Sequence, residues 1–331
     1  WAVAAWSSGP MTAEEVLAMA PFKDHIDTLE RGDIMMLGMP DMESRNELVV
    51  IMAVLVPASL ESTVTTLQRQ ASDPNAPGMM AIHEIGDDLS ASQIDALFRR
   101  LRFDVSEFSE VRRLMAIAPG NQHNFSSSEI ALIREHAAAV PPGADVDAAA
   151  AMAAAMAAVL QQRYLAYRNQ GLAGVTPYQV GPAQQAEPAL ELIAATESAV
   201  MVQERMPAYY GCLRHYPQCS APRLVHQFFW NKQREDKRPL FVLKHWISDV
   251  QPAYALITER QYYLSHALSS LQVVIGCMPH RDGTLVVLLN QAFTDKVAIP
   301  IGRTIAKGIG RVQVEKRIRP MFERLRAAYA Q

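Results

Sequence analysis

The histidines and carboxylates are the residues with the most chemical potential, because these types supply the acids, bases and metal ligands of proteins. The chain contains nine histidines and 34 acidic residues. Two pairs are close enough in sequence to be weighed as acid and base, His245 with Asp249 and Glu259 with His266. The spacing of Glu259 and His266 places them on opposite faces of a strand. The segment from Ser248 to Pro252 is typical of a turn, which argues against a shared face for the first pair.

Motifs for nucleophilic catalysis and phosphate binding are missing from the sequence. Gly-x-Ser-x-Gly, Ser-x-x-Lys and the Walker glycine pattern do not occur. Cys212 and Cys219 flank His215, but a zinc site would need further ligands at a recognisable spacing. The two cysteines form a disulfide in an oxidising compartment or remain two thiols in the cytosol. We therefore predict no catalytic residue, no metal and no cofactor.

Composition bounds the class of protein. Of 331 residues, 50% are hydrophobic, and 31 basic against 34 acidic residues leave a net charge of -3. This balance produces no field that would attract nucleic acid. The longest apolar runs, Ala148 to Leu160 and Leu48 to Ala58, are shorter than the roughly 20 residues of a membrane-spanning helix. We expect a soluble protein without a transmembrane span.

The first residues carry a hint about location. Ala2-Val3-Ala4 is similar to the small-residue end of a secretory signal. We interpret it as export, to the periplasm or elsewhere. The alternative is that residue 1 is an arbitrary boundary or the start of a fragment.

Helix starts are marked by hydroxyl residues with Glu or Gln three positions later, the capping-box pattern. The alanine-dense segment from Asp145 to Arg168 predicts one long helix. A further helix is expected from Glu187 to Gln203, and the segment from Pro207 to Pro222 is expected to be loop-rich. The three capping boxes are Thr12 with Glu15, Ser90 with Gln93, and Ser126 with Glu129.

The last third of the chain changes to strand-like patterning. A hairpin is indicated at His280-Arg-Asp-Gly283, and an earlier strand at Glu47 to Val56 leads through Pro57 into a helix. The C-terminal segment has the spacing of a helix, in which Pro320 should cause a kink or mark a new first turn. The strands of the predicted antiparallel meander are Pro239 to Ile247, Tyr254 to Leu264, Leu271 to Met278 and Thr284 to Asn290.

This order of elements resembles the START-like, or helix-grip, superfamily of hydrophobic-ligand binders. The resemblance lies in the strand-to-helix segment Val49 to Val64, in the meander and in the ending from Gly302 to Ala330. It covers roughly half of the chain and contains no diagnostic motif. It implies a single α+β domain over residues 1–330, with residues 81–222 as a mainly helical insertion. A curved antiparallel sheet would pack on the long C-terminal helix and enclose an apolar cavity.

The resemblance also implies a function, the binding or transport of a hydrophobic ligand such as a lipid, fatty acid or isoprenoid. A few polar side chains of the meander would orient the head group of the ligand. Strand alternation puts Glu259, Gln261 and Tyr263 on one face, and either face of the strand could point inward. The predicted ligand-binding residues are Trp230, His245, Glu259, Gln261, Tyr263, His266 and Asn290, and His226 and Asp295 are further polar candidates.

Other classes of function remain open. An enzyme such as a cyclase or hydrolase would use a histidine and a carboxylate in the same cavity, and a scaffold protein would have no cavity. The C-terminal helix could also contact an anionic membrane surface, but we favour a solvated outer face, because the apolar stripe from Val314 to Tyr329 is regular enough to be buried. Its basic residues are Arg303, Lys307, Arg311, Lys316, Arg317, Arg319, Arg324 and Arg326, against Glu315 and Glu323.

Overall fold

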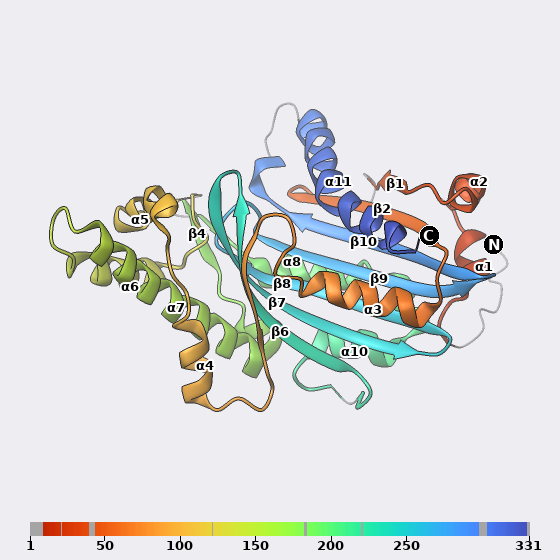
Figure 1. Ribbon diagram of the computed structural model, residues 1–331, viewed down its shortest axis with the longest axis horizontal. Coiled ribbons are helices and arrows are strands. Elements are labelled where there is room, and N and C mark those ends of the chain that lie inside the picture. Colours follow the sequence, from red (N-terminus) through yellow and green to blue (C-terminus); the bar gives the residue numbers. More distant parts are fainter. Residues whose placement is uncertain are drawn as a thin grey trace.

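An antiparallel sheet of eight strands forms the centre of the molecule (Figure 1). The computed structural model describes residues 9–20, 22–39, 44–120, 122–181, 184–219, 221–297 and 303–329. The strand order is β1-β2-β10-β9-β8-β7-β6-β3. The strands are β1 (Met35–Gly38), β2 (Glu47–Val56), β3 (Met79–Ile85), β6 (Val225–Glu235), β7 (Arg238–Gln251), β8 (Tyr254–Leu264), β9 (Ser270–His280) and β10 (Gly283–Phe293).

Strands β7 to β10 form the expected meander, and β6, which was not predicted, extends it by one strand; each strand pairs with the next. Arg281 has a φ of 51° in the β9–β10 hairpin, at the predicted turn. The β6–β7 hairpin turns at Asp236 and Lys237, whose φ values of 47° and 66° are those of a tight two-residue turn. Strand β7 continues to Gln251, so the turn expected from Ser248 to Pro252 is wrong, because β7 keeps its pairing with β8 as far as Gln251.

One face of the sheet is covered by α3 (Leu60–Ala71) and α11 (Arg303–Ala327), which lie in front of the strands in Figure 1. Phe322 and Leu325 of α11 are fully buried against this face. Pro320 lies inside the continuous helix. The predicted long C-terminal helix packed on an antiparallel sheet is therefore confirmed.

The opposite face is covered by helices that include α8 and α10, which lie behind the strands in Figure 1. The three predicted capping boxes and the long alanine-rich helix α7 are confirmed. The remaining helices are α1 (Ala13–Leu17), α2 (Ile26–Glu30), α4 (Ala91–Phe98), α5 (Phe108–Met115), α6 (Ser127–Ala138), α7 (Asp145–Gln170), α8 (Pro188–Glu197), α9 (Val200–Arg205) and α10 (Pro207–His215).

Two expectations for the middle of the chain need correction. The helix expected from Glu187 to Gln203 is broken at Ser198 and Ala199 into α8 and α9. The segment expected to be loop-rich from Pro207 contains helix α10, which buries Tyr209 and Leu213 against the sheet and starts with proline at a position that a helix tolerates. Cys212 of α10 and Cys219 form a disulfide.

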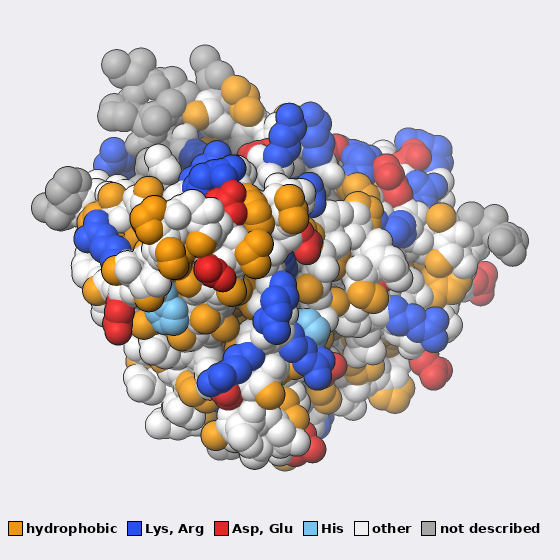
Figure 2. All heavy atoms as spheres, turned by 60° about the vertical axis from the view of Figure 1, so that its left-hand side comes forward, with side chains coloured by type: hydrophobic (Ala, Val, Ile, Leu, Met, Phe, Trp, Pro, Cys, Tyr) orange, Lys and Arg blue, Asp and Glu red, His pale blue; other side chains and the backbone are white. Residues whose placement is uncertain are grey.

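Helices α4 to α7 form a helical end on one side of the sheet (Figure 1). The region between β3 and β6 is mainly helical, with a small two-stranded sheet of β4 (Tyr178–Gly181) and β5 (Gln184–Ala186). The insertion was expected to begin at Ala81, which lies within β3. Figure 2 shows basic, acidic and hydrophobic side chains interspersed on this end, as the nearly balanced composition leads one to expect.

No helix in the described part of the chain combines the length and the apolar character needed to cross a membrane. Residues 1–8, on which the export prediction depends, lie outside the described residues.

Candidate functional site

A cavity of about 440 Å³ lies between α1, α9 and the sheet. Val274, Gly276 and Met278 of β9 line it, whereas Ile275 and Cys277 between them point to the face that packs on α11. Because side chains alternate along a strand, the cavity lies on the sheet face opposite the C-terminal helix. The START-like resemblance implies an apolar cavity between the sheet and that helix, but Phe322 and Leu325 are packed into that interface. A pocket does lie at the end of the helix, and its lining is largely charged, with Arg281, Glu323 and Arg326.

Methionine gives this cavity its character, and we call it the methionine cavity. Six of the 16 methionines of the chain line it: Met11, Met19, Met39, Met201, Met206 and Met278. Aliphatic side chains of α1, α9 and four strands complete most of the wall, together with the aromatic rings of Phe22 and Tyr254. Unbranched thioether side chains adapt to irregular apolar shapes. The site is therefore suited to hold an apolar molecule.

Arg205 joins two walls of the methionine cavity. Its guanidinium donates to both carboxylate oxygens of Glu15, at 3.0 and 3.1 Å, and to the carbonyl of Gly9 at 2.7 Å. The Arg205 side chain is 4% exposed, and that of Glu15 is 29% exposed. Glu15 also accepts from the backbone N–H of Thr12 in the α1 capping box. This ion pair fixes α9 to the N-terminal turn of α1.

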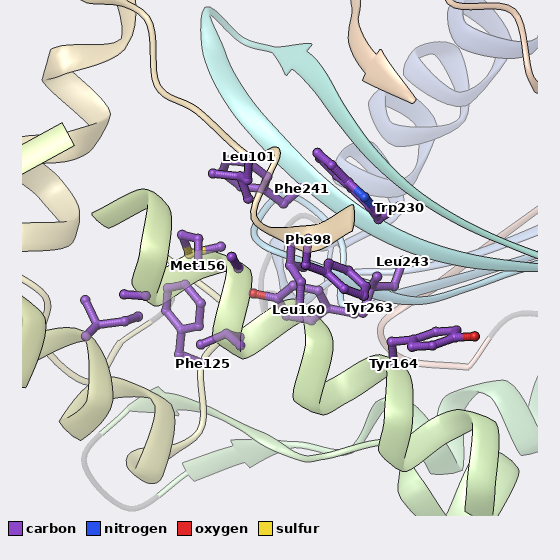
Figure 3. Close-up of a cluster of buried hydrophobic side chains, with 14 of the residues drawn as sticks. Phe98, Leu101, Phe125, Met156, Leu160, Tyr164, Trp230, Phe241, Leu243 and Tyr263 are labelled. Atoms are coloured by element: carbon purple, nitrogen blue, oxygen red, sulfur yellow. The ribbon is translucent and has the colours of Figure 1, made fainter. Parts of the chain in front are cut away.

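The seven predicted ligand-binding residues do not line the methionine cavity. Trp230 and Tyr263 are buried in the hydrophobic cluster between the sheet and the helical end, where Figure 3 shows them among Phe98, Leu160 and Leu243. Both side chains are about 1% exposed. Their surroundings are those of core residues.

Glu259 and Gln261 lie on the α3 side of the sheet and contact each other. The carboxylate of Glu259 accepts from Trp246 Nε1 and from Gln261 Nε2, both at 2.6 Å, and lies 3.5 Å from Lys244 Nζ. Burial raises the pKa of Glu259, but the Lys244 charge and these hydrogen bonds outweigh it, so the pKa is lowered. Asn290 lies on the same side and is 3% exposed.

His245 lies at the centre of a buried chain of hydrogen bonds on the other side. Its Nδ1 is 3.0 Å from the Tyr167 hydroxyl, and its Nε2 is 2.9 Å from Nδ1 of His226. Arg260 donates to the same hydroxyl at 3.3 Å. Burial first, and then electrostatic interaction with His226 and with the charged Arg260, holds the pKa of His245 well below its ordinary value. His245 is therefore neutral near pH 7.

The two acid–base pairs considered from sequence do not form. His245 and Asp249 share a face of β7, but Asp249 accepts from Tyr254 and Gln251 and pairs with Arg223. Glu259 accepts from Trp246 and Gln261 instead. His266 lies 3.1 Å from the carbonyl of Pro239. The structure therefore joins neither histidine to its suggested carboxylate.

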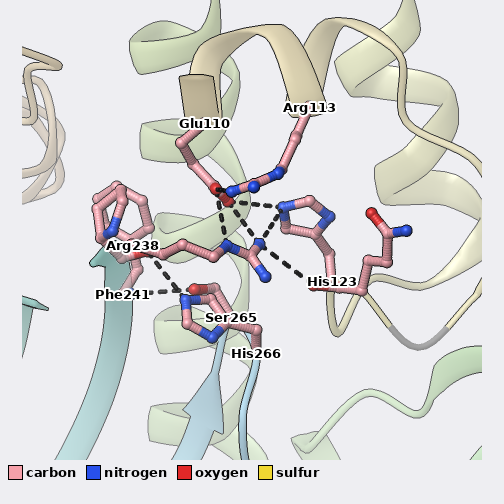
Figure 4. A network of polar contacts seen from close by, with 9 residues as sticks. Glu110, Arg113, His123, Arg238, Phe241, Ser265 and His266 are labelled. Carbon is pink, nitrogen blue, oxygen red and sulfur yellow. Dashed lines mark hydrogen bonds and ion pairs between the residues drawn. The ribbon is translucent and has the colours of Figure 1, made fainter. Parts of the chain in front are cut away.

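A histidine–carboxylate pair that sequence reasoning missed is His123 with Glu110, 2.7 Å apart (Figure 4). Arg238 donates to both Glu110 oxygens at 2.8 Å, and Arg113 donates at 3.0 Å. Burial raises the pKa of Glu110, but the contacts with His123 and Arg238 prevail and lower it. Every Glu110 oxygen is engaged, so this network serves to hold α5 against β7.

The methionine cavity was also missed, because its lining comes from short segments distant in sequence. Met11 and Met19 flank a five-residue helix, and Met201 and Met206 belong to a six-residue helix and its end. The only available signal was the high methionine count. In comparisons with known proteins, no family model, no curated protein and no solved structure matches the chain.

Proposed function

We propose that the protein binds a hydrophobic small molecule in the methionine cavity, as a binding or carrier protein. The observation that carries the proposal is the cavity itself, about 440 Å³ with an almost wholly apolar wall. Ligand pockets in proteins span roughly 300–1,000 Å³ and are lined mainly by hydrophobic side chains. The START-like resemblance of the sequence implies a lipid-like ligand and therefore supports the same proposal.

The alternatives fit this cavity less well. An enzyme using a histidine and a carboxylate would need both groups at the cavity, and neither type is present among the described residues that line it. The Glu110–His123 pair belongs to the separate network in Figure 4. A scaffold protein would need no cavity at all.

We also propose that the protein functions in an oxidising compartment, such as the periplasm. The disulfide between Cys212 and Cys219 supports this, because disulfides persist mainly in exported proteins. Alkylation of the thiols of the protein as isolated from its native host, before and after reduction, tests this proposal. Labelling of both cysteines without reductant would contradict the proposal.

Contact of α11 with an anionic membrane surface is a secondary part of the proposal. Ile309 and Val312 are 60% and 45% exposed on this helix, beside the exposed Lys316. Against it, Arg317 pairs with Glu235, and Arg319 with Glu315. Sedimentation with phosphatidylserine vesicles should show weak binding that is lost at high salt. Equal binding to neutral vesicles would remove the electrostatic part of the proposal.

Native mass spectrometry is the first test of ligand binding. The purified protein is compared with a denatured, solvent-extracted sample, and we expect an apolar molecule at near one per chain. The Gly276→Leu variant should lose it, since an added Cβ at Gly276 meets only Met278 Cε at 3.7 Å and a longer side chain enters the cavity. Gly308→Leu, on α11, is the matched control. A clean apo mass, repeated after exposure to a lipid extract, would overturn the proposal.

A further inference from the structure

The polar groups at the methionine cavity already have partners within the protein. The Ser198 hydroxyl donates to the carbonyl of Ala195 at 3.0 Å and accepts from Gln291 at 2.6 Å. The Tyr254 hydroxyl donates to Asp249 at 2.8 Å. A ligand head group would therefore compete with existing hydrogen bonds instead of filling vacant ones.

Charge at the cavity is likewise balanced. Arg205 is the one charged side chain among the described residues of the lining, and Glu15 neutralises it through two hydrogen bonds. A carboxylate or phosphate placed in the cavity would have to displace Glu15 or lie beside it. Burying an ion without a partner is strongly unfavourable, and apolar contacts elsewhere would have to offset the lost hydration.

From this we infer that the cavity selects uncharged apolar ligands, such as a hydrocarbon, an isoprenoid alcohol or an aromatic molecule, and rejects fatty-acid carboxylates and phosphates. The inference rests on the proposed function and narrows its ligand class. The methionine side chains can repack around apolar molecules of different shape. The cavity should therefore select uncharged apolar ligands as a class and not one particular shape.

Glu15 has a defined role in this selection. It supplies the negative charge that Arg205 would otherwise offer to a ligand. Replacing Glu15 with glutamine removes the charge but keeps a side chain that can complete the capping box with Thr12. The variant should therefore accept anionic ligands better than the native protein does, with helix α1 intact.

Two matched pairs of probes test the inference. N-phenyl-1-naphthylamine and 8-anilinonaphthalene-1-sulfonate share one framework and differ in a sulfonate; 1-dodecanol and dodecanoate, used to displace the bound neutral dye, differ only in the head group. Specific binding is defined as the part that is lost in Gly276→Leu and kept in Gly308→Leu. We expect the neutral member of each pair to bind at least about tenfold tighter than the anionic member. This difference in affinity should become smaller in Glu15→Gln.

The outcomes separate the two proposals. Equal or tighter specific binding of the anionic probes, or an unchanged difference in affinity in Glu15→Gln, would overturn the selection for uncharged ligands and leave the binding function standing. Absence of specific binding for both members of both pairs would overturn the binding function and the inference with it. Circular dichroism of each variant confirms that the comparison is made on folded protein.

Discussion

The guanidinium of Arg205 and the carboxylate of Glu15, 190 positions apart in sequence, lie 3.0 Å from each other at the edge of the methionine cavity. This contact joins α9 to the start of α1. Both helices are short, with six and five residues, and have little intrinsic stability of their own. These two helices are therefore the parts of the cavity wall most able to open.

We predict that Glu15→Gln speeds the exchange of a neutral ligand. Loss of the ion pair should raise the dissociation rate of N-phenyl-1-naphthylamine several-fold in stopped-flow displacement, while the association rate rises by a similar factor, because opening is needed in both directions. Thr12→Ala is the control: it removes the helix cap, at about 1 kcal/mol, and leaves the Arg205–Glu15 pair in place. If Thr12→Ala speeds exchange as much as Glu15→Gln, local helix stability and not the ion pair controls access.

His266 should make stability depend on pH. Burial first, and then the charge of Arg238, lowers the pKa of His266 to about 4, while Glu110 opposes and His123 adds to this shift. The unfolded state binds the proton near pH 6.5, so folding is favoured above that pH and loses stability as pH falls toward 4. We expect a loss on the order of 2 kcal/mol between pH 7 and pH 5 from this residue.

Urea unfolding of His266→Gln at the two pH values measures that contribution. Glutamine keeps a donor for the Pro239 carbonyl, which His266 contacts at 3.1 Å, but does not titrate. The pH-dependent loss should shrink in this variant and persist in His136→Gln, a replacement on the partly exposed side of α6. An unchanged pH dependence in His266→Gln would show that other groups cause it.

The sheet was predictable because its information is local. Strand β2 was expected at its observed bounds, since a run of apolar residues ends at a proline, and the three capping boxes depend on residues three positions apart. Strand β3 was missed because most of its residues are only half-buried at the sheet edge. Helix α10 was missed because glycine, proline and two cysteines in this segment favour a loop, whereas burial of Tyr209 and Leu213 decides for a helix.

The site was less predictable because it depends on distant contacts. Residues such as His245 and Glu259 were chosen because they are chemically versatile and lie on strands. Tertiary packing, however, decides which face of the sheet holds the cavity. The sequence offers no signal that pairs Glu15 with Arg205 or Glu110 with Arg238. These contacts join segments more than 100 positions apart.

Reduction of the Cys212–Cys219 disulfide should destabilise the fold. The loop of eight residues is short, and the chain-entropy model gives about 2.5 kcal/mol for a loop of this length. Tyr216 within the loop stacks against Tyr167, with ring centroids 5.7 Å apart. Loss of the disulfide should therefore also disturb the buried hydrogen bonds of His245, which Tyr167 contacts. Thermal unfolding with and without a reductant measures the loss, and a Cys212→Ser/Cys219→Ser variant that ignores the reductant is the control. An unchanged melting temperature on reduction of the native protein would contradict the prediction.

Glu110 should be the carboxylate whose loss costs most in the network of Figure 4. It is 3% exposed and accepts from Arg238, Arg113 and His123, so Glu110→Gln leaves the two arginines without the counter-charge that they contact. Breaking a buried pair costs up to about 3–5 kcal/mol, and the partial exposure of both arginines places the expected loss nearer 2–3 kcal/mol.

The same residue should also show a characteristic pH dependence. Because the folded state lowers the pKa of Glu110, its contribution to stability is complete above the ordinary value of 4.5 and is lost as pH falls through the lowered pKa. Unfolding in urea at pH 7 and pH 3 should therefore show the Glu110→Gln defect shrinking at the lower pH. Glu197→Gln serves as the comparison, since Glu197 is 56% exposed in its pair with Arg214 and should cost under about 1 kcal/mol at either pH. A Glu110→Gln defect of equal size at both pH values would mean that lost packing, and not lost charge, destabilises the variant.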